Sequence, residues 1–202
     1  ADGPSGLWRS VRLTGTMGSP SMSCEALMSK PAFVFLSALA VSGCVSTPPP
    51  RIHLASAFQS DIARRMLEKG SNSIHGSALI RQRGGGVVSC AGNEVILVPS
   101  MSYSDERMRI IYGPGYSGYR PLLGAREGVF ADDPPEYRDL TLRTRCDAQG
   151  NFRFARVADG SFWITTRIIW QVRAYATPEG GDLMQRVTVK GGEIKEVVLS
   201  PH

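Results

Sequence analysis

The sequence predicts a mainly β protein, a seven-stranded antiparallel β-sandwich preceded by one amphipathic helix. The chain of 202 residues is rich in turn formers, with 22 Gly and 13 Pro, whereas 8% of its residues are aromatic. Gly-containing turns separate short apolar runs, and several runs alternate apolar and polar side chains with the period of a half-buried strand. A helical bundle or a coiled coil does not have such frequent Gly- and Pro-containing turns.

Residues 28–43 have the layout of a secretory signal peptide. Lys30 provides the short basic start, and an uncharged apolar run follows over 31–41 before a group of small residues. This run is shorter than the roughly 20 apolar residues that span a bilayer. We expect residues 1–27, which have no apolar periodicity, to lie upstream of the true start, either the Met that opens the signal segment or Met22.

The end of the signal segment, Val41-Ser42-Gly43-Cys44, resembles a bacterial lipobox, in which an aliphatic residue and two small residues precede the lipidated cysteine. The resemblance implies cleavage before Cys44 and its acylation, so that the protein is a lipoprotein anchored to a membrane of the bacterial cell envelope. Val45 stands where an Asp favours retention at the inner membrane, so the resemblance favours the outer membrane, facing the periplasm. Residues 44–53, with three consecutive prolines, form the expected tether.

After the tether the apolar spacing becomes helical. Four apolar side chains recur at every fourth position: Leu54, Phe58, Ile62 and Met66. This spacing predicts an amphipathic helix over 54–70, because such residues share one face. Gly70 is a natural stop just past the last helical turn.

Strands dominate the remaining residues, 71–202. Seven short runs have strand composition, at 75–82, 94–98, 139–145, 151–155, 161–172, 183–190 and 193–199. Between them lie sets of Gly, Asp and Asn that supply the positive φ angles of tight turns. In the fifth run, alternate residues are apolar and predict one buried face: Phe162, Ile164, Ile168 and Trp170.

One stretch, 146–164, carries a more specific pattern. It has an Asp-x-x-Gly turn, a strand with two alternate aromatic residues, an aliphatic residue, a second Gly turn and an aromatic strand. The residues that supply it are, in order, Asp147, Gly150, Phe152, Phe154, Val157, Gly160, Phe162 and Ile164. This order resembles carboxypeptidase regulatory-like domains, which have a transthyretin-like (prealbumin-like) sandwich. The resemblance implies that fold for 71–202 and is nearly silent on function.

An irregular insertion separates the second predicted strand from the third. A short helix is expected to start at Ser102 or Ser104, and Gly- and Pro-rich chain follows. A loop this long is typical of a functional or partner-ordered segment, although an ordinary surface excursion is the alternative. Aromatic and Arg side chains anchor many interfaces, so the predicted interaction surface consists of Tyr103, Tyr112, Tyr116, Tyr119 and Arg120.

The four cysteines divide by location. Once Cys44 is lipidated and Cys24 lies in the discarded leader, Cys90 and Cys146 are the pair left in an exported protein. A disulfide between them would close a loop of about 56 residues and stabilise the fold by about 4 kcal/mol. The alternative is two buried free thiols.

No enzymatic activity and no cofactor are predicted. Transthyretin-like hydroxyisourate hydrolases would require catalytic histidines and a Tyr-Arg-Gly-Ser tail, whereas the last residues here are Leu-Ser-Pro-His. Ring-cleaving dioxygenases on a related sandwich hold iron with two Tyr and two His. We do not expect His53, His75 and His202 to converge for that purpose.

Neither a metal nor a nucleic acid is predicted as a ligand. Asp132, Asp133 and Glu136 could offer oxygen atoms to calcium, but two intervening prolines make a solvated acidic turn the better interpretation. The net charge of +5 is spread along the chain without a block of like charges, which is typical of a solvated surface rather than of a nucleic-acid-binding face.

The aromatic residues allow a sugar-binding platform. Trp170 falls on the apolar phase of its strand and is expected in the core, whereas Trp163 falls on the opposite phase and is expected to be exposed. The sequence therefore predicts a non-catalytic binding or scaffolding module, an accessory subunit with an envelope protein as its partner. The alternative is a carbohydrate-binding envelope lipoprotein that recognises a glycan through exposed aromatic side chains.

Overall fold

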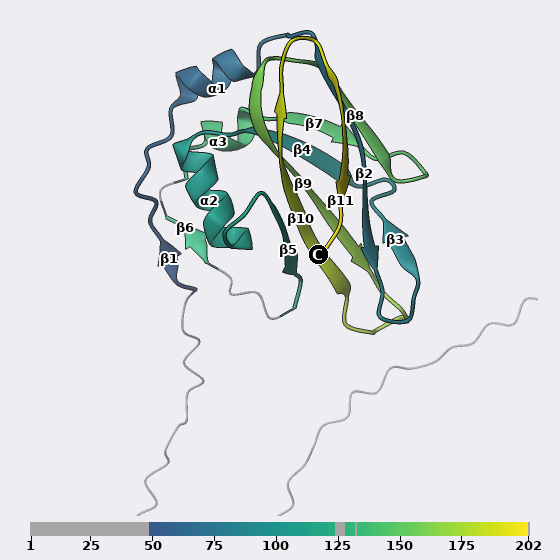
Figure 1. Cartoon of the computed structure of the whole chain (residues 1–202). Coiled ribbons are helices and arrows are strands. Elements are labelled where there is room, and N and C mark those ends of the chain that lie inside the picture. The colour runs from purple at the N-terminus through teal and green to yellow at the C-terminus, as the bar shows by residue number, and fades with distance from the viewer. Residues whose placement is uncertain (1–48, 124–127, 132, 202) are drawn as a thin grey trace, which may run out of the picture. The chain divides into compact units, whose positions relative to one another are not determined.

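Two β-sheets face each other across an apolar core, and a layer of helices covers the outer face of one of them (Figure 1). The computed structural model describes residues 49–123, 128–131 and 133–201. The predicted leader, the signal peptide 28–43 and the lipidation site Cys44 lie outside the described residues. Within these residues, no helix is both long enough and apolar enough to span a membrane.

The larger sheet has five strands in the order β5-β10-β9-β4-β7, and every neighbouring pair is antiparallel. Its strands are β4 (Glu94–Pro99), β5 (Ser117–Pro121), β7 (Leu142–Arg145), β9 (Gly160–Trp170) and β10 (Glu179–Val189). The long β9–β10 hairpin forms its centre and pairs Trp163 with Arg186.

The smaller sheet is built around one long central strand. Its members are β2 (Asn72–Arg81), β3 (Val87–Ser89), β8 (Asn151–Val157) and β11 (Ile194–Leu199). Along one side of β2 lie β8 and then β3, both antiparallel to it, and β11 lies along the other side. Because β11 runs parallel to β2, the expectation of a wholly antiparallel sandwich is wrong at this strand.

The inner core lies between these two sheets. The larger sheet contributes Phe162, Ile164 and Leu183, which are fully buried, and the smaller sheet contributes Ile74 and Leu199. The predicted disulfide between Cys90 and Cys146 is confirmed and belongs to this core. The alternation in β9 therefore identified its inner face correctly.

Gly76 marks a close approach of strands within the smaller sheet. A Cβ atom at this position would come within 2.6 Å of both Phe152 Cζ and Val197 Cγ2. The two side chains lie on the strands that flank Gly76, and they fill the space that its missing side chain leaves.

An aromatic layer covers the outer face of the larger sheet. It contains α2 (Ser102–Tyr112), α3 (Glu136–Asp139) and the extended chain before α1 (Ser60–Met66). The rings of Phe58, Tyr103 and Tyr137 pack edge to face with centroids 5.1–5.5 Å apart. The sequence allowed this insertion to be an ordinary surface loop. In the structure it instead forms a second hydrophobic core, the outer core, with Trp163 and Met184.

The predicted mainly β class is confirmed, but seven strands is too low a number. All seven predicted runs contain a strand, and the described residues hold eleven. The additional ones are β3, β5, β1 (Arg51–Ile52) and β6 (Val129–Phe130). The pairing of β1 with β6 also means that the predicted tether, 44–53, joins the folded part at its end.

The predicted helix over 54–70 is too long, since α1 covers Ser60–Met66 alone. The backbone N–H groups of Ala55 and Ser56 donate to the carboxylate of Glu106 instead of to a helical turn. Gly70 is not a helix cap: its Cβ would lie 2.2 Å from the carbonyl oxygen of Val157, so glycine is needed there for close strand approach.

Candidate functional site

Two predicted binding residues that are distant in the sequence, Tyr116 and Trp163, line the same hollow. This aromatic hollow has a volume of about 490 Å³ and lies where α2, the turn after it and the β9–β10 hairpin meet. Helix α2 contributes Asp105, Glu106 and Arg109, the turn contributes Tyr116, β9 contributes Trp163 and β10 contributes Arg186. Aromatic, anionic and cationic side chains therefore surround one cavity.

Trp163 is 4% exposed, so its predicted exposure is wrong. The strand phase was correct, because Trp163 points away from the inner core, but the aromatic layer covers that face. Its indole Nε1 donates a hydrogen bond of 2.6 Å to Asp105 Oδ1, which also accepts one of 2.6 Å from Ser100 Oγ. These two donors fix the Asp105 carboxylate at the edge of the hollow.

Arg186 lies opposite Trp163 in the β9–β10 register. Its guanidinium carbon is 5.3 Å from the ring centroid of Tyr116 and 5.6 Å from that of Trp163, within the range of cation–π attraction. Its backbone N–H donates to the carbonyl oxygen of Tyr116 at 2.6 Å, which ties the turn to β10. Its Nε is buried and has no hydrogen-bond partner among the residues that the structure describes.

Glu106 holds the wall of the aromatic hollow formed by the chain before α1. Its two carboxylate oxygens accept the backbone N–H groups of Ala55 and Ser56, each at 2.9 Å. These hydrogen bonds favour the charged form, so they lower the pKa of Glu106 below its ordinary value. Both oxygens of this carboxylate thus already accept hydrogen bonds from the protein's own backbone.

Tyr116 is 69% exposed and is the one predicted tyrosine whose ring is free for a ligand. Tyr103, in contrast, is buried, and its hydroxyl donates to Asp133 Oδ1 at 2.6 Å. Burial and this carboxylate raise the pKa of Tyr103. Tyr119 is half-buried and donates to the carbonyl oxygen of Gly180 at 2.9 Å. The predicted single surface of insertion tyrosines is therefore wrong.

Tyr112 and Arg120 line a different hollow, of about 500 Å³, next to Asp182. The guanidinium of Arg120 lies 3.7 Å from that carboxylate, which also receives two hydrogen bonds from Arg167. Burial raises the pKa of Tyr112 above its ordinary value. Arg120 and Arg167 thus pair with Asp182, and neither Tyr112 nor Arg120 meets Tyr116 in one site.

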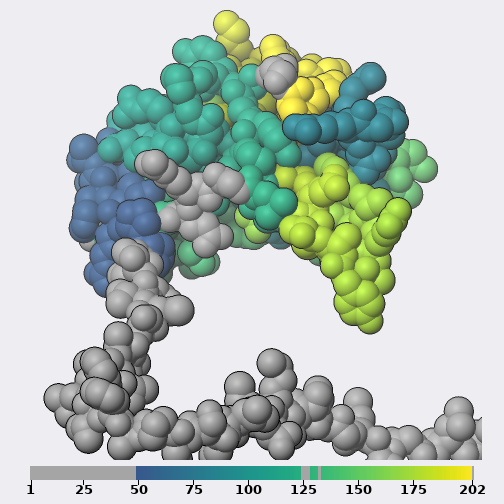
Figure 2. All heavy atoms as spheres, turned by 90° about the horizontal axis from the view of Figure 1, so that it is seen from below, coloured from purple at the N-terminus to yellow at the C-terminus, as the bar shows by residue number. Residues whose placement is uncertain are grey.

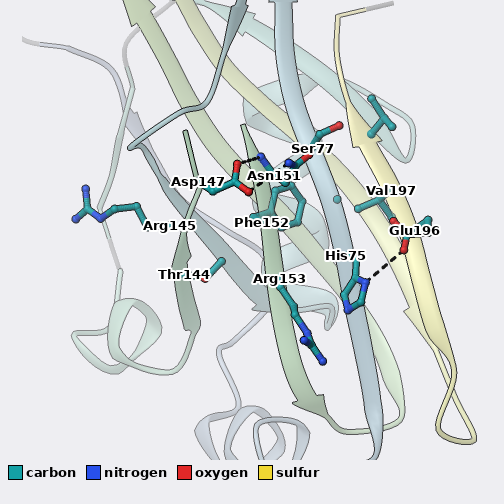
Figure 3. Close-up of a pocket in the computed structure, with 12 residues that line it drawn as sticks. His75, Ser77, Thr144, Arg145, Asp147, Asn151, Phe152, Arg153, Glu196 and Val197 are labelled. Carbon is teal, nitrogen blue, oxygen red and sulfur yellow. Dashed lines mark hydrogen bonds and ion pairs between the residues drawn. The ribbon is translucent and has the colours of Figure 1, made fainter. Parts of the chain in front are cut away.

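A third hollow, of about 640 Å³, lies on the smaller sheet (Figure 3). The strand register places Arg153, His75 and Glu196 side by side on β8, β2 and β11. His75 Nδ1 is 3.3 Å from Glu196 Oε1, whereas His75 Nε2 is buried and finds no hydrogen-bond partner in the described part of the chain. This His75 hollow could not be predicted from the sequence, since pairing of β11 with β2 is a long-range contact without a local signal.

The His75 hollow has no exposed aromatic ring. Phe152, the Phe in its lining, is 4% exposed. Asp147 accepts the backbone N–H groups of Gln149 and Asn151, and the bond from Asn151 is the main cause of its lowered pKa. This hollow therefore lacks the flat apolar surface that the aromatic hollow has.

No metal site can be assigned from the described residues, in which no three His, Cys, Asp or Glu side chains are grouped to hold an ion. Asp132 lies outside the described residues, and Asp133 forms a short ion pair with Arg107. The guanidinium of Arg107 also stacks on Phe130, with its carbon 3.8 Å from the ring centroid. Asp133 therefore stabilises the aromatic layer through Tyr103 and Arg107.

The fold and the site define a mainly β, sandwich-like protein with an aromatic hollow beside its larger sheet. Among solved structures, a putative carbohydrate binding protein of Pseudomonas aeruginosa is similar to it, with a TM-score of 0.58 and 20% sequence identity. The similarity covers 72% of this chain and 98% of that chain. At this identity the likeness shows the fold alone. No protein-family profile matches the chain, and no curated protein matches it significantly.

Proposed function

We propose that this chain is a non-catalytic carbohydrate-binding module and that the aromatic hollow is its binding site. The observation that carries the proposal is the exposed ring of Tyr116, which stands beside Arg186, Trp163 and Asp105 around one cavity. The apolar faces of sugar rings pack on aromatic side chains, and their hydroxyls exchange hydrogen bonds with charged groups. The structural neighbour is a putative carbohydrate binding protein, which agrees with this ligand class.

The site is also organised before a ligand arrives. Trp163 and Ser100 orient the Asp105 carboxylate, and the backbone bond between Arg186 and Tyr116 holds the exposed ring in place. A site whose groups are already ordered loses less conformational entropy on binding. This order supports a binding role for the hollow.

The proposal includes the transthyretin-like type of sandwich and a lipid anchor at Cys44 in the bacterial cell envelope, on the outer membrane. The lipobox-like sequence supports the anchor, and the Cys90–Cys146 disulfide agrees with an oxidising compartment. The pattern of turns and aromatic residues over 146–164 supports the sandwich type. Replacement of Cys44 by Ala should abolish incorporation of labelled fatty acid, and unchanged labelling would reject the anchor.

A second candidate function is docking of an envelope protein partner, and the turn between β9 and β10 favours it. This turn projects from the protein surface (yellow-green in Figure 2). It carries the fully exposed ring of Tyr175 and the exposed side chain of Val172. If the turn docks a partner, Tyr175→Ala should reduce crosslinking in native membranes, and an unchanged crosslinking yield would remove this candidate.

The binding function is tested by titrating the full chain with a panel of soluble oligosaccharides while tryptophan fluorescence is recorded. Trp163 lines the aromatic hollow, so a bound sugar should change the emission. Tyr116→Ala should weaken binding about tenfold or more with unchanged thermal unfolding. Tyr175→Ala is the matched control, because this exposed tyrosine lies outside the hollow. Equal binding by Tyr116→Ala and wild type, or no binding across the panel, would overturn the proposal.

A further inference from the structure

We propose that the saccharide taken by the aromatic hollow is acidic, with a uronate carboxylate bound by Arg186 and Arg109. This inference rests on the proposed carbohydrate-binding function and specifies its ligand. It follows from which charged groups in the hollow are already engaged by the protein itself and which are left without a partner.

The two carboxylates of the aromatic hollow are engaged. Asp105 Oδ1 accepts hydrogen bonds from the indole of Trp163 and the hydroxyl of Ser100. Both oxygens of Glu106 accept backbone N–H groups. These carboxylates position neighbouring parts of the protein, and much of their capacity to accept hydrogen bonds from sugar hydroxyls is used.

The two guanidinium groups are not engaged in this way. Within the described residues, neither Arg109 nor Arg186 makes a side-chain hydrogen bond or an ion pair. Arg109 is exposed, whereas Nε of Arg186 is buried and unsatisfied. A buried donor without a partner is unfavourable, and contact with aromatic rings compensates for this in part.

The other two half-buried arginines among the described residues do have a carboxylate partner. Arg107 is paired with Asp133, and Arg120 lies beside Asp182. Arg186 departs from this pattern although its guanidinium lies close to two aromatic rings and lines a cavity. The planar guanidinium matches a carboxylate with two parallel N–H···O bonds, so a ligand carboxylate would supply the missing partner.

The same cavity offers the rest of what a uronate residue needs. Tyr116 presents an exposed ring for the apolar face of the sugar. The carboxylate at C5 of a pyranose lies at the edge of the ring, so stacking and ion pairing can occur together. A neutral sugar would leave the buried donor of Arg186 to be satisfied by a hydroxyl, a weaker acceptor than a carboxylate.

The test compares tetragalacturonate with its fully methyl-esterified form, in which a neutral methyl ester replaces each carboxylate, by calorimetric titration of the full chain. The acid should bind at least about tenfold more tightly than the ester. Arg186→Gln should bring this ratio close to one, and Arg109→Gln should reduce it. Arg153→Gln, which removes an unpaired arginine from the His75 hollow, should leave the ratio unchanged.

Each outcome separates this inference from the function on which it rests. If the ester binds as tightly as the acid, or if neutral cello- or chito-oligosaccharides bind and the acid does not, the module still binds saccharides and the uronate inference is wrong. The inference is also wrong if both Arg109→Gln and Arg186→Gln keep the wild-type ratio while remaining folded by thermal unfolding. If no saccharide binds, the proposed function fails as well.

Discussion

The two faces of the five-stranded sheet are packed by different means. The inner face meets a second sheet through aliphatic and aromatic side chains, and the outer face meets the aromatic layer of helices. Phe162 and Trp163 are neighbours on β9, yet they belong to the inner core and the outer core respectively. The comparison shows that one strand can pack the inner core with one face and line the candidate site with the other.

The outer core depends more on polar contacts. The indole of Trp163 is bonded to Asp105, and the hydroxyl of Tyr103 is bonded to Asp133, which also pairs with Arg107. The inner core is formed almost wholly by apolar side chains. Partly buried polar networks hold their side chains in fixed orientations. This explains why the candidate site adjoins the outer core.

The largest expected effect comes from truncating the inner core. Phe162 is fully buried, so Phe162→Ala should lower the free energy of unfolding by about 3–5 kcal/mol through lost burial and the resulting cavity. Urea unfolding followed by circular dichroism measures this value. A loss below about 1 kcal/mol would contradict the placement of Phe162 between the sheets.

A smaller effect is expected on the other face at the next residue. Trp163→Phe keeps an aromatic ring but removes the N–H that Asp105 accepts, which should lower the free energy of unfolding by about 1.5–3 kcal/mol. It should also weaken saccharide binding, since Asp105 loses one of its two orienting donors. Parallel unfolding and ligand titrations measure both effects. Unchanged binding at unchanged stability would show that the indole N–H does not organise the hollow.

The smallest expected effect is the response of two hydrogen-bonded carboxyl groups to acid, one beside the aromatic hollow and one in the His75 hollow. Hydrogen bonds from Ala55 and Ser56 lower the pKa of Glu106, and those around Asp147 lower the pKa of that carboxyl. A lowered folded-state pKa adds stability above the unfolded value, about 4.3 for Glu, and this stability is lost as the pH falls through the folded value. Glu106→Gln and Asp147→Asn should each be less stable than wild type at pH 7.

These stability differences should shrink as the pH falls below about 4, because the wild-type carboxyls then become protonated as well. Saccharide binding at pH 7 should weaken in Glu106→Gln and stay unchanged in Asp147→Asn, since Glu106 lines the aromatic hollow and Asp147 does not. Urea unfolding from pH 7 to pH 3 and one titration of each variant measure this. A pH-independent difference between Glu106→Gln and wild type would contradict the hydrogen-bonded carboxylate.

The inner face could be predicted from the sequence because its signals are local. The alternation of Phe162, Ile164 and Ile168 identified the buried side of β9 without knowledge of its neighbours. The disulfide could be predicted from the small number of cysteines in a chain that was expected to be exported. The sequence also predicted a short helix that starts at Ser102 or Ser104, and α2 starts at Ser102.

The outer face could not be predicted in the same way, since its contacts join distant segments. Trp163 was expected to be exposed because alternation reports which way a side chain points and not what covers it. The spacing of Leu54 and Phe58 predicted a helix, but both side chains pack into the aromatic layer from extended chain, where Glu106 holds the backbone. Arg186 had no local signal, and the strand register alone brings it to Tyr116 and Trp163.

The central claim, that the aromatic hollow binds a saccharide, is tested most directly by ¹H–¹⁵N NMR of the full chain titrated with tetragalacturonate. Trp163→Phe assigns the indole N–H resonance of Trp163 by its disappearance. The ligand should shift this resonance and the backbone amides of Tyr116 and Arg186, and it should leave those of His75 and Arg153 in place. Shifts confined to His75 and Arg153, or no shifts with any saccharide that binds, would contradict the claim.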